Sequence, residues 1–305
     1  LEQIGTYSAQ YERGEISLER YQAYQRDACP ACGACSFMGT ASTMQVMAEA
    51  LGIALPGSAL IPSHLPELEQ MAVAAGERSV ALAKEDLRPS RILTREAFEN
   101  AIMVHAAIAG SSNSLLHLPA VAHELGWDLS PELFDELHRR IPYILNIRPS
   151  GFWPGEYFWY AGGVPAVMRE IRKFLHLDVL TVTGKTLGEN LDRLEAEGFY
   201  EHCHAYLAEK KVTVEEIIRP IDRPIRPQGA IAILKGNLAP DGAVVKHSAI
   251  SPKLLQATLR ARVFDREEDA IAAILRKAVH PGEAVFIRYE GPKGSGMPEM
   301  FYTTE

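Results

Sequence analysis

Three cysteines lie within seven residues of one another near the start of the sequence: Cys29, Cys32 and Cys35. Thiolates are soft ligands that bind zinc and iron–sulfur clusters, and a helix N-terminus stabilises the thiolate form. A structural zinc site needs a fourth ligand, for which Cys203 is the remaining cysteine. On spacing alone, a metal site and inert buried thiols are equally open interpretations.

A run of small polar residues, Gly110 to Ser114, opens a predicted helix. Hydroxyl and N–H groups at a helix start can bind a carboxylate, so Ser111, Ser112 and Asn113 are candidate substrate ligands. An ordinary N-cap explains the same residues, and capping statistics favour that interpretation when the segment is taken alone.

Glu290 leaves an apolar predicted strand and enters a glycine-rich loop over residues 291–296. Carboxylate oxygens are ligands that Mg²⁺ prefers, and glycines let the backbone approach a ligand closely. Glu290 is therefore the candidate metal ligand. The alternative is a solvated glutamate at a strand end, which is the more common situation.

Two other patterns are interpreted as structural. The segment Thr183-Gly184-Lys185-Thr186 is similar to the end of a phosphate-binding P-loop, but Val179 stands where that pattern needs a glycine. A helix entry is the better interpretation. The histidines on predicted helices, including His105, show no metal-binding spacing, so they are expected to be packed or surface histidines without a metal role.

The composition restricts the class of protein. The 305 residues are 47% apolar and carry a net charge of −8, without a basic cluster for nucleic acid. No apolar run approaches the roughly 18 residues that span a bilayer. Clustered cysteines favour a reducing compartment, so the cytoplasm is expected. The chain begins at Leu1 without a Met or a signal peptide, and a fragment of a longer protein is expected.

The elements that must position these residues are mainly helices. Apolar spacing predicts a first helix over 40–51, with Thr40 or Ser42 as its cap. Further helices are predicted over 66–84, 95–109, 112–125, 163–175 and 186–196, with another beginning at Pro131.

The pattern changes after about residue 220. Three prolines between Pro220 and Pro227 predict a linker, and residues 230–234 and 284–289 are predicted strands. We expect an α/β fold with two domains, a helix-rich α/β domain over 1–218 and a β-rich domain over 219–305.

Taken in order, six stretches of the chain resemble the dihydroxy-acid dehydratase / 6-phosphogluconate dehydratase family. They are 29–44, which contains CPACGACSFMGTASTM, then 110–126, 161–167, 180–190, 232–240 and 287–300. Because they are collinear over nearly the whole chain, the resemblance is specific. It implies a cluster domain followed by a barrel-like, swivelling domain.

The resemblance also implies a site. Family members hold a [2Fe–2S] or [4Fe–4S] cluster through three cysteines far apart in sequence, of which Cys35 is one, whereas Cys29 and Cys32 are not ligands. Glu290 corresponds to a Mg²⁺ ligand of the family. The remaining cluster and Mg²⁺ ligands precede the matched stretch, and the catalytic base, a serine, is expected beyond Glu305.

The variant at 35–40, together with 54–60, most resembles the sugar-acid branch typified by xylonate dehydratases. That branch implies dehydration of an aldonate such as D-xylonate to a 2-keto-3-deoxy acid, by a homodimer or homotetramer. The chemical alternative is a branched-chain dihydroxy-acid dehydratase. A non-catalytic remnant is the alternative from another class.

Overall fold

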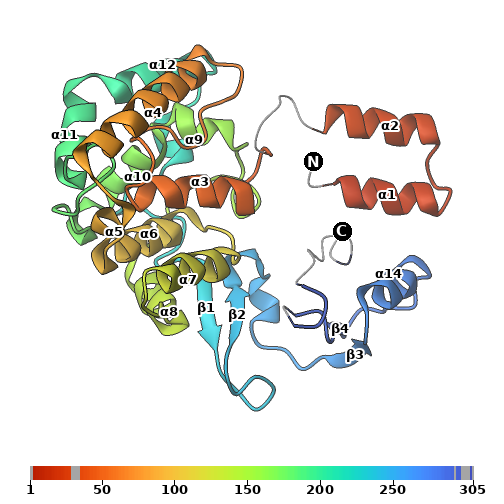
Figure 1. The fold of residues 1–305 in the computed structure, drawn as a ribbon. Helices are drawn as coiled ribbons and strands as arrows, with labels where there is room; N and C mark the ends of the chain where they lie inside the picture. The colour runs from red at the N-terminus through yellow and green to blue at the C-terminus, as the bar shows by residue number, and fades with distance from the viewer. Residues whose placement is uncertain (1–2, 29–34, 292, 297–302, 304–305) are drawn as a thin grey trace. The chain divides into compact units, whose positions relative to one another are not determined.

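The computed structural model describes residues 3–28, 35–291, 293–296 and 303. The chain forms two compact units, one of residues 31–250 and one of residues 1–30 together with 251–305. The larger unit includes the helices from α3 to α13 and the strands β1 and β2 (Figure 1). Within the described residues, no helix combines the length and the apolarity that crossing a bilayer would need.

The larger unit is mostly helical. Its strands β1 (Ile231–Leu234) and β2 (Ala243–Lys246) pair antiparallel. Its helices are α3 (Thr40–Ala50), α4 (Pro66–Glu85), α5 (Pro89–Ile92), α6 (Arg95–Ile108), α7 (Ser114–Glu124), α8 (Pro131–Arg140), α9 (Glu156–Tyr160), α10 (Gly163–Glu170), α11 (Leu187–Ala196), α12 (Phe199–Glu209) and α13 (Val214–Ile217), with 3-10 turns η1 (Arg172–Phe174) and η2 (His247–Ala249).

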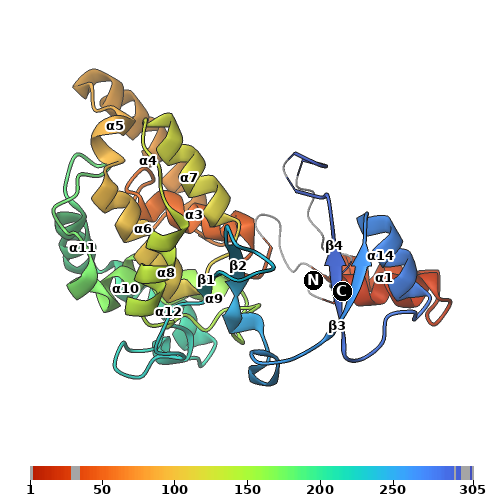
Figure 2. The same cartoon turned by 90° about the horizontal axis from the view of Figure 1, so that it is seen from below.

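Helix α6 forms the centre of the larger unit's core. Every residue from Ala101 to Ile108 is buried, and α6 contacts α3, α8 and α10 (Figures 1 and 2). Its many alanines keep the helix surface narrow, which lets neighbouring backbones approach closely. Thr94 caps the start by accepting a hydrogen bond from Ala97 N at 3.3 Å. The helix ends at Ala109, whose φ of 51° is left-handed.

Helix α8 lies along the outer edge of β1 (Figures 1 and 2). Alternate residues of a strand direct their N–H groups away from the paired strand. Here Ile233 N donates to Asp135 Oδ1 at 2.9 Å, and Ile231 N donates to His138 Nδ1 at 3.1 Å. Side chains three residues apart on α8 therefore satisfy backbone donors two residues apart on β1.

The proline-rich segment 219–227 contains no regular helix, as predicted. It packs beside residues 143–147 of the same unit. Arg219 N donates to Ile144 O at 2.9 Å, and Ile225 N donates to Tyr143 O at 2.9 Å. Tyr143 and Ile144 therefore hold this segment near both of its ends.

Where the structure describes it, the smaller unit has four helical elements and one strand pair. They are α1 (Ile4–Glu12), α2 (Leu18–Asp27), the 3-10 turn η3 (Pro252–Leu254), β3 (Arg260–Phe264), α14 (Glu267–Leu275) and β4 (Glu283–Ile287). Strands β3 and β4 pair parallel, with Arg260 opposite Glu283, and α14 connects them. That order is the β–α–β unit, in which a helix makes the crossover between parallel strands.

The fold class is confirmed as α/β, with many helices and small sheets. The barrel-like arrangement expected for residues 219–305 stays a prediction, since the described residues contain two sheets of two strands. The division at residue 218 also stays a prediction for the whole protein. The structure's own units differ from it, because β1 and β2 lie in the larger unit with the helices.

Most predicted helices are present within a few residues of their expected ends. The side-chain cap expected for the helix predicted over 40–51, which is α3 in the structure, is wrong. Gly39 is the N-cap of α3 and no side chain caps it. Thr40 and Ser42 are used elsewhere, because Ser42 Oγ donates back to Phe37 O at 3.1 Å and Thr40 accepts from a distant loop.

Candidate functional site

Cys35 lies in a loop that leads directly into α3. The loop is fixed by backbone hydrogen bonds from Met38 N to Arg148 O at 2.6 Å and from Gly155 N to Ser36 O at 2.7 Å. The thiol of Cys35 is half-buried, and its one described contact is a long hydrogen bond to Phe37 O at 3.7 Å. Cys29 and Cys32 lie outside the described residues.

The polar segment Ser111–Asn113 packs against the first turns of α3. Ser111 N donates to Thr43 Oγ1 at 3.0 Å, and Asn113 Nδ2 donates to Thr40 Oγ1 at 2.5 Å. Asn113 is the N-cap residue of α7, yet its side chain makes no capping hydrogen bond. The capping interpretation of this segment is therefore wrong for Asn113, whose amide instead joins the loop to the helix that follows Cys35.

The far end of α3 is held by a buried carboxyl group that the sequence interpretation missed. Glu49 Oε1 accepts from Gly57 N at 2.7 Å and Glu49 Oε2 accepts from Ala59 N at 2.8 Å. Burial raises the pKa of Glu49 to about 7. The backbone donors lower the pKa, because they favour the charged form, but the effect of burial is larger. Glu49 thus fixes α3 at the end opposite Cys35.

Two histidines join the Ser111–Asn113 segment to α8. His105 Nε2 lies 2.9 Å from Ser111 O and 2.7 Å from Ser114 Oγ, and His105 Nδ1 lies 3.0 Å from His138 Nε2. Both rings are fully buried. Burial lowers the pKa of His105 to about 4, and burial together with the neighbouring histidines lowers the pKa of His138. Both rings are therefore neutral at pH 7.

Glycine at two positions makes room for these rings. A Cβ atom at Gly110 would collide with the ring of His105. A Cβ atom at Gly229 would lie 2.5 Å from His138 Nδ1 and 2.8 Å from Ala106 Cβ. Of the packed and surface positions expected for the histidines, His105 occupies a packed one, but packing alone does not describe its hydrogen bonds.

Lys246 places a positive charge near the same histidines. Lys246 lies on β2, and its cross-strand partner is Ile231 on β1, which is buried; paired residues of an antiparallel sheet project to the same face. Burial lowers the pKa of Lys246 to about 8, and its charge is one cause of the low pKa of His105. Among the described residues no carboxylate pairs with Lys246.

Glu290 lies in the smaller unit, directly after Tyr289, whose φ of 67° is left-handed. Its Oε1 accepts a hydrogen bond from Glu267 N at 3.2 Å, at the start of α14. The hydroxyl of Ser295 and the Glu267 N–H lower the pKa of Glu290. The carboxylate is therefore ionised, as a metal ligand must be, and its described contact stabilises a helix start.

The donors present fit one ligand of each implied metal group. Cys35 offers a half-buried sulfur, which suits an iron–sulfur cluster, and Glu290 offers an ionised carboxylate, which suits Mg²⁺. Cys203 does not fit, because burial raises the pKa of its thiol to about 12. No group of three His, Cys, Asp or Glu side chains that could hold a metal occurs in the part of the chain that the structure describes. Completion of either site needs residues beyond these.

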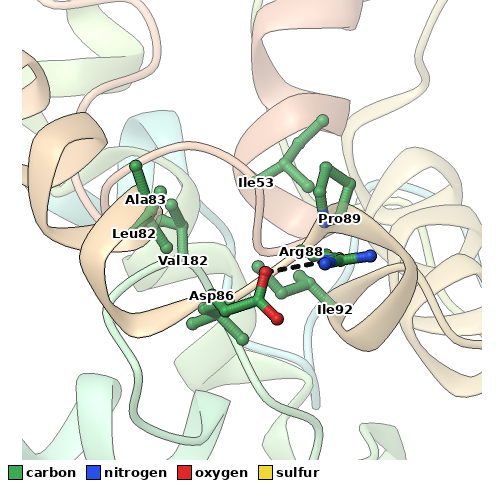
Figure 3. Close-up of a pocket in the computed structure, with 9 residues that line it drawn as sticks. Ile53, Leu82, Ala83, Asp86, Arg88, Pro89, Ile92 and Val182 are labelled. Atoms are coloured by element: carbon green, nitrogen blue, oxygen red, sulfur yellow. Dashed lines mark hydrogen bonds and ion pairs between the residues drawn. The ribbon is translucent and has the colours of Figure 1, made fainter.

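A pocket elsewhere in the larger unit is lined by none of these residues. Its volume is about 310 Å³, and it is lined by apolar side chains with the exposed Asp86–Arg88 ion pair at its rim (Figure 3). The Arg88 Nε and Asp86 Oδ1 atoms are 2.7 Å apart. This pocket contains no group able to act as acid, base or metal ligand apart from that ion pair, so it is not the candidate site.

Two family models match most of the chain. The model described as "Dihydroxy-acid/6-phosphogluconate dehydratase N-terminal" matches residues 1–190. The model described as "Dihydroxy-acid/6-phosphogluconate dehydratase C-terminal" matches residues 216–305. The matched ranges include Cys35, Ser111–Asn113, His105 and Glu290.

Similar proteins cover the chain almost completely. A protein named dihydroxy-acid dehydratase from Caldicellulosiruptor saccharolyticus is 44% identical, and dihydroxy-acid dehydratase 1 from Methanosarcina acetivorans is 46% identical. A dihydroxy-acid dehydratase from Acetivibrio thermocellus is 42% identical. Each alignment covers 99% of this chain and 52% of the relative. The chain therefore spans about half the length of these relatives.

Proposed function

Since the chain belongs to the dihydroxy-acid/6-phosphogluconate dehydratase family, we propose that the full protein removes water from a branched-chain 2,3-dihydroxy acid. The names of the similar proteins support this substrate class better than the sugar acid that the 35–40 variant favours. In the reaction, C3 loses its hydroxyl group and C2 loses its proton. The enol that results becomes a 2-keto acid, and one water molecule is released.

One observation carries the proposal. The polar Ser111–Asn113 segment is hydrogen-bonded to the first turns of the helix that follows Cys35. A candidate soft metal ligand and a group of hydroxyl and amide side chains therefore belong to one local structure. In the proposed dehydration, a Lewis acid would act on the leaving hydroxyl while polar side chains hold the other oxygens of the substrate.

In this proposal Cys35 supplies one ligand of an iron–sulfur cluster and Glu290 supplies one ligand of Mg²⁺. When bound, such groups supply Lewis acidity toward the leaving hydroxyl and the carboxylate. The side chains of Ser111, Ser112 and Asn113 hold substrate hydroxyl groups by hydrogen bonds. The base that takes the C2 proton remains a prediction for the sequence beyond Glu305.

We propose further that Lys246 attracts the substrate's carboxylate. An ammonium group that is half-buried and unpaired has lost part of its hydration without gaining a partner. A bound carboxylate would supply that partner. With a pKa of about 8, the group is mostly protonated at pH 7.

The test uses the full-length protein, purified without oxygen and analysed for iron, sulfide and Mg²⁺ dependence. Formation of 2-keto acid is measured with 2,3-dihydroxy-3-methylbutanoate and with D-xylonate. We expect kcat/KM to be about a hundredfold higher for the branched acid, because a pocket shaped for methyl groups leaves the extra hydroxyls of xylonate unpaired. A preference for D-xylonate would support the sugar-acid function instead. Turnover of neither acid by iron-loaded protein would support a non-catalytic remnant.

A further inference from the structure

We propose that His105 is a positioning residue for the substrate segment, and that His138 fixes the orientation of its ring. The inference rests on the proposed function, because it assigns substrate contacts to Ser111–Asn113. Its structural part concerns hydrogen bonds within the larger unit alone. It can therefore be tested separately from turnover.

The hydrogen bonds along this chain of groups can run in one direction only. Ile231 N can only donate, so His138 Nδ1 must accept. A neutral imidazole carries one proton, which places that proton on His138 Nε2, where it is donated to His105 Nδ1. The proton of His105 is then on Nε2 and is donated toward Ser111 O and Ser114 Oγ.

The backbone of Ser111 is held on both sides as a result. Its carbonyl oxygen accepts from His105 Nε2 at 2.9 Å and from Ser114 Oγ at 2.9 Å. Its N–H group donates to Thr43 Oγ1 on α3 at 3.0 Å. A segment fixed at both backbone groups presents its side chains in one orientation, which lowers the cost of binding a ligand.

An ordinary core pair would not need this arrangement. Two buried imidazoles are costly to desolvate, whereas apolar side chains of similar size would fill the same space. Glycine occurs at 110 and at 229, where any side chain would enter the space of one ring. The two histidine rings, and the space that the two glycines leave for them, allow the series of hydrogen bonds that leads from Ile231 N on β1 to Ser111 O.

The experiment compares His105→Gln with His105→Asn in the full-length protein. The amide nitrogen of glutamine can occupy the place of Nε2 and donate to Ser111 O. Asparagine is shorter, so its amide stays near the place of Nδ1 and leaves Ser111 O without this donor. We expect KM to rise about tenfold or more for His105→Asn and to stay within about threefold of the original for His105→Gln.

Hydrogen exchange gives a readout that does not depend on activity. We expect His105→Asn to lose amide protection over residues 110–113 while α6 and α8 keep theirs, and His105→Gln to retain protection throughout. The variant His138→Leu, which removes the donor to His105 Nδ1, is expected to lose protection over the same four residues.

Two results would overturn the inference. One is unchanged exchange at 110–113 in both His138→Leu and His105→Asn. The other is a uniform loss of protection along α6 and α8, which would make the pair a packing element only. If no variant, including the original protein, turns over a dihydroxy acid while the exchange pattern is as expected, the proposed function fails and the positioning role stands.

Discussion

Cys35 and Cys203 carry the same thiol in opposite surroundings. Cys35 is half-buried in a loop before α3, whereas Cys203 is fully buried on α12. Burial in an apolar environment disfavours the thiolate, which is the form that binds metal. The two cysteines are therefore a matched pair for testing which one serves a cluster.

We expect Cys35→Ser in the full-length protein to abolish the visible absorbance of an iron–sulfur cluster and to reduce bound iron to background. Cys203→Ala should leave both unchanged and lower the free energy of unfolding by about 1 kcal/mol, because it removes one buried sulfur atom. Anaerobic spectra and iron analysis check this. Equal loss of absorbance in the two variants would contradict the assignment of Cys35.

Lys246 gives a second test at the scale of one residue. In Lys246→Met the unpaired charge is removed, so the free energy of unfolding at pH 7 should stay equal or rise by about 1–2 kcal/mol. The KM for the acid substrate should rise about tenfold or more, because a bound carboxylate loses its partner. Urea unfolding and steady-state kinetics measure the two effects.

Lys235 is the control for this prediction. It lies just after β1, and its ammonium forms an exposed ion pair with Glu132 at 2.9 Å. The variant Lys235→Met should leave KM unchanged. If Lys235→Met and Lys246→Met raise KM equally, a general loss of positive charge explains the effect and Lys246 has no specific role.

At the residue scale, the sequence predicted candidate site residues but not which side chains hydrogen-bond to one another. Ser111 and Asn113 follow from a local pattern of small polar residues. The pairing of His105 with His138 does not, because 33 residues separate them and no spacing rule connects two helices packed side by side. The glycines at 110 and 229 were a usable signal, since each lies where a ring needs the space of a side chain.

At the scale of elements, the contact between α8 and β1 tests how much stability is gained when a side chain satisfies a backbone N–H group at the edge of a strand. Asp135 satisfies a half-buried backbone N–H of Ile233 in addition to its ion pair with Arg139, whereas Glu132 forms an exposed ion pair on the same helix and satisfies no backbone donor of β1 among the described contacts. We expect Asp135→Ala to lower the free energy of unfolding by about 1–2 kcal/mol. Glu132→Ala should change it by less than about 0.5 kcal/mol.

Urea midpoints of the two variants and of Asp135→Asn measure this difference. Asparagine keeps a carbonyl oxygen for Ile233 N, so it should recover part of the loss. Equal effects of Asp135→Ala and Glu132→Ala would show that the surface charge, and not the backbone donor, is what matters on α8.

Elements with long periodic patterns were predictable, whereas of the four short strands that the structure describes only β1 and β4 were. Helices α4, α6 and α11 follow from apolar spacing and caps, including the capping box that Thr186 and Glu189 form at the start of α11. Strands β2 and β3 have four and five residues and are largely exposed. Segments this short carry too few alternating positions to be distinguished from loops by periodicity, although the apolar runs at β1 and β4, which have the same lengths, were enough to predict those two strands.

At the scale of the whole molecule, buried histidines predict a dependence of stability on pH. The unfolded chain binds a proton at His105 near pH 6.5, whereas the folded chain binds one only near pH 4. Between these values protons favour the unfolded state. The stability that neutral His105 contributes is therefore complete above pH 6.5 and is lost as the pH falls toward 4.

The measurement compares the original protein with His105→Gln between pH 4 and pH 7. The original should lose on the order of 2–3 kcal/mol more than the variant over this range. The comparison removes the opposite effect of Glu49, whose raised pKa of about 7 gives stability that is lost as the pH rises. Parallel curves for the two proteins would contradict a buried neutral His105.

The number of subunits is a further prediction at this scale. The chain spans about half the length of its relatives, and the resemblance implies a homodimer or homotetramer, which sedimentation of the full-length protein would measure. The family and the α/β class were predictable because collinear motifs extend over the whole chain. The placement of β1 beside α8 was not, because it depends on contacts between residues about 100 positions apart.

The contact between α8 and β1 determines where further polypeptide can be added. An incoming strand must exchange hydrogen bonds with a row of free backbone groups. Asp135 and His138 already accept hydrogen bonds from the outward N–H groups of β1. Another strand therefore cannot pair with that edge of β1. Any strand added to this sheet would therefore pair with β2, and the sheet can extend in one direction only.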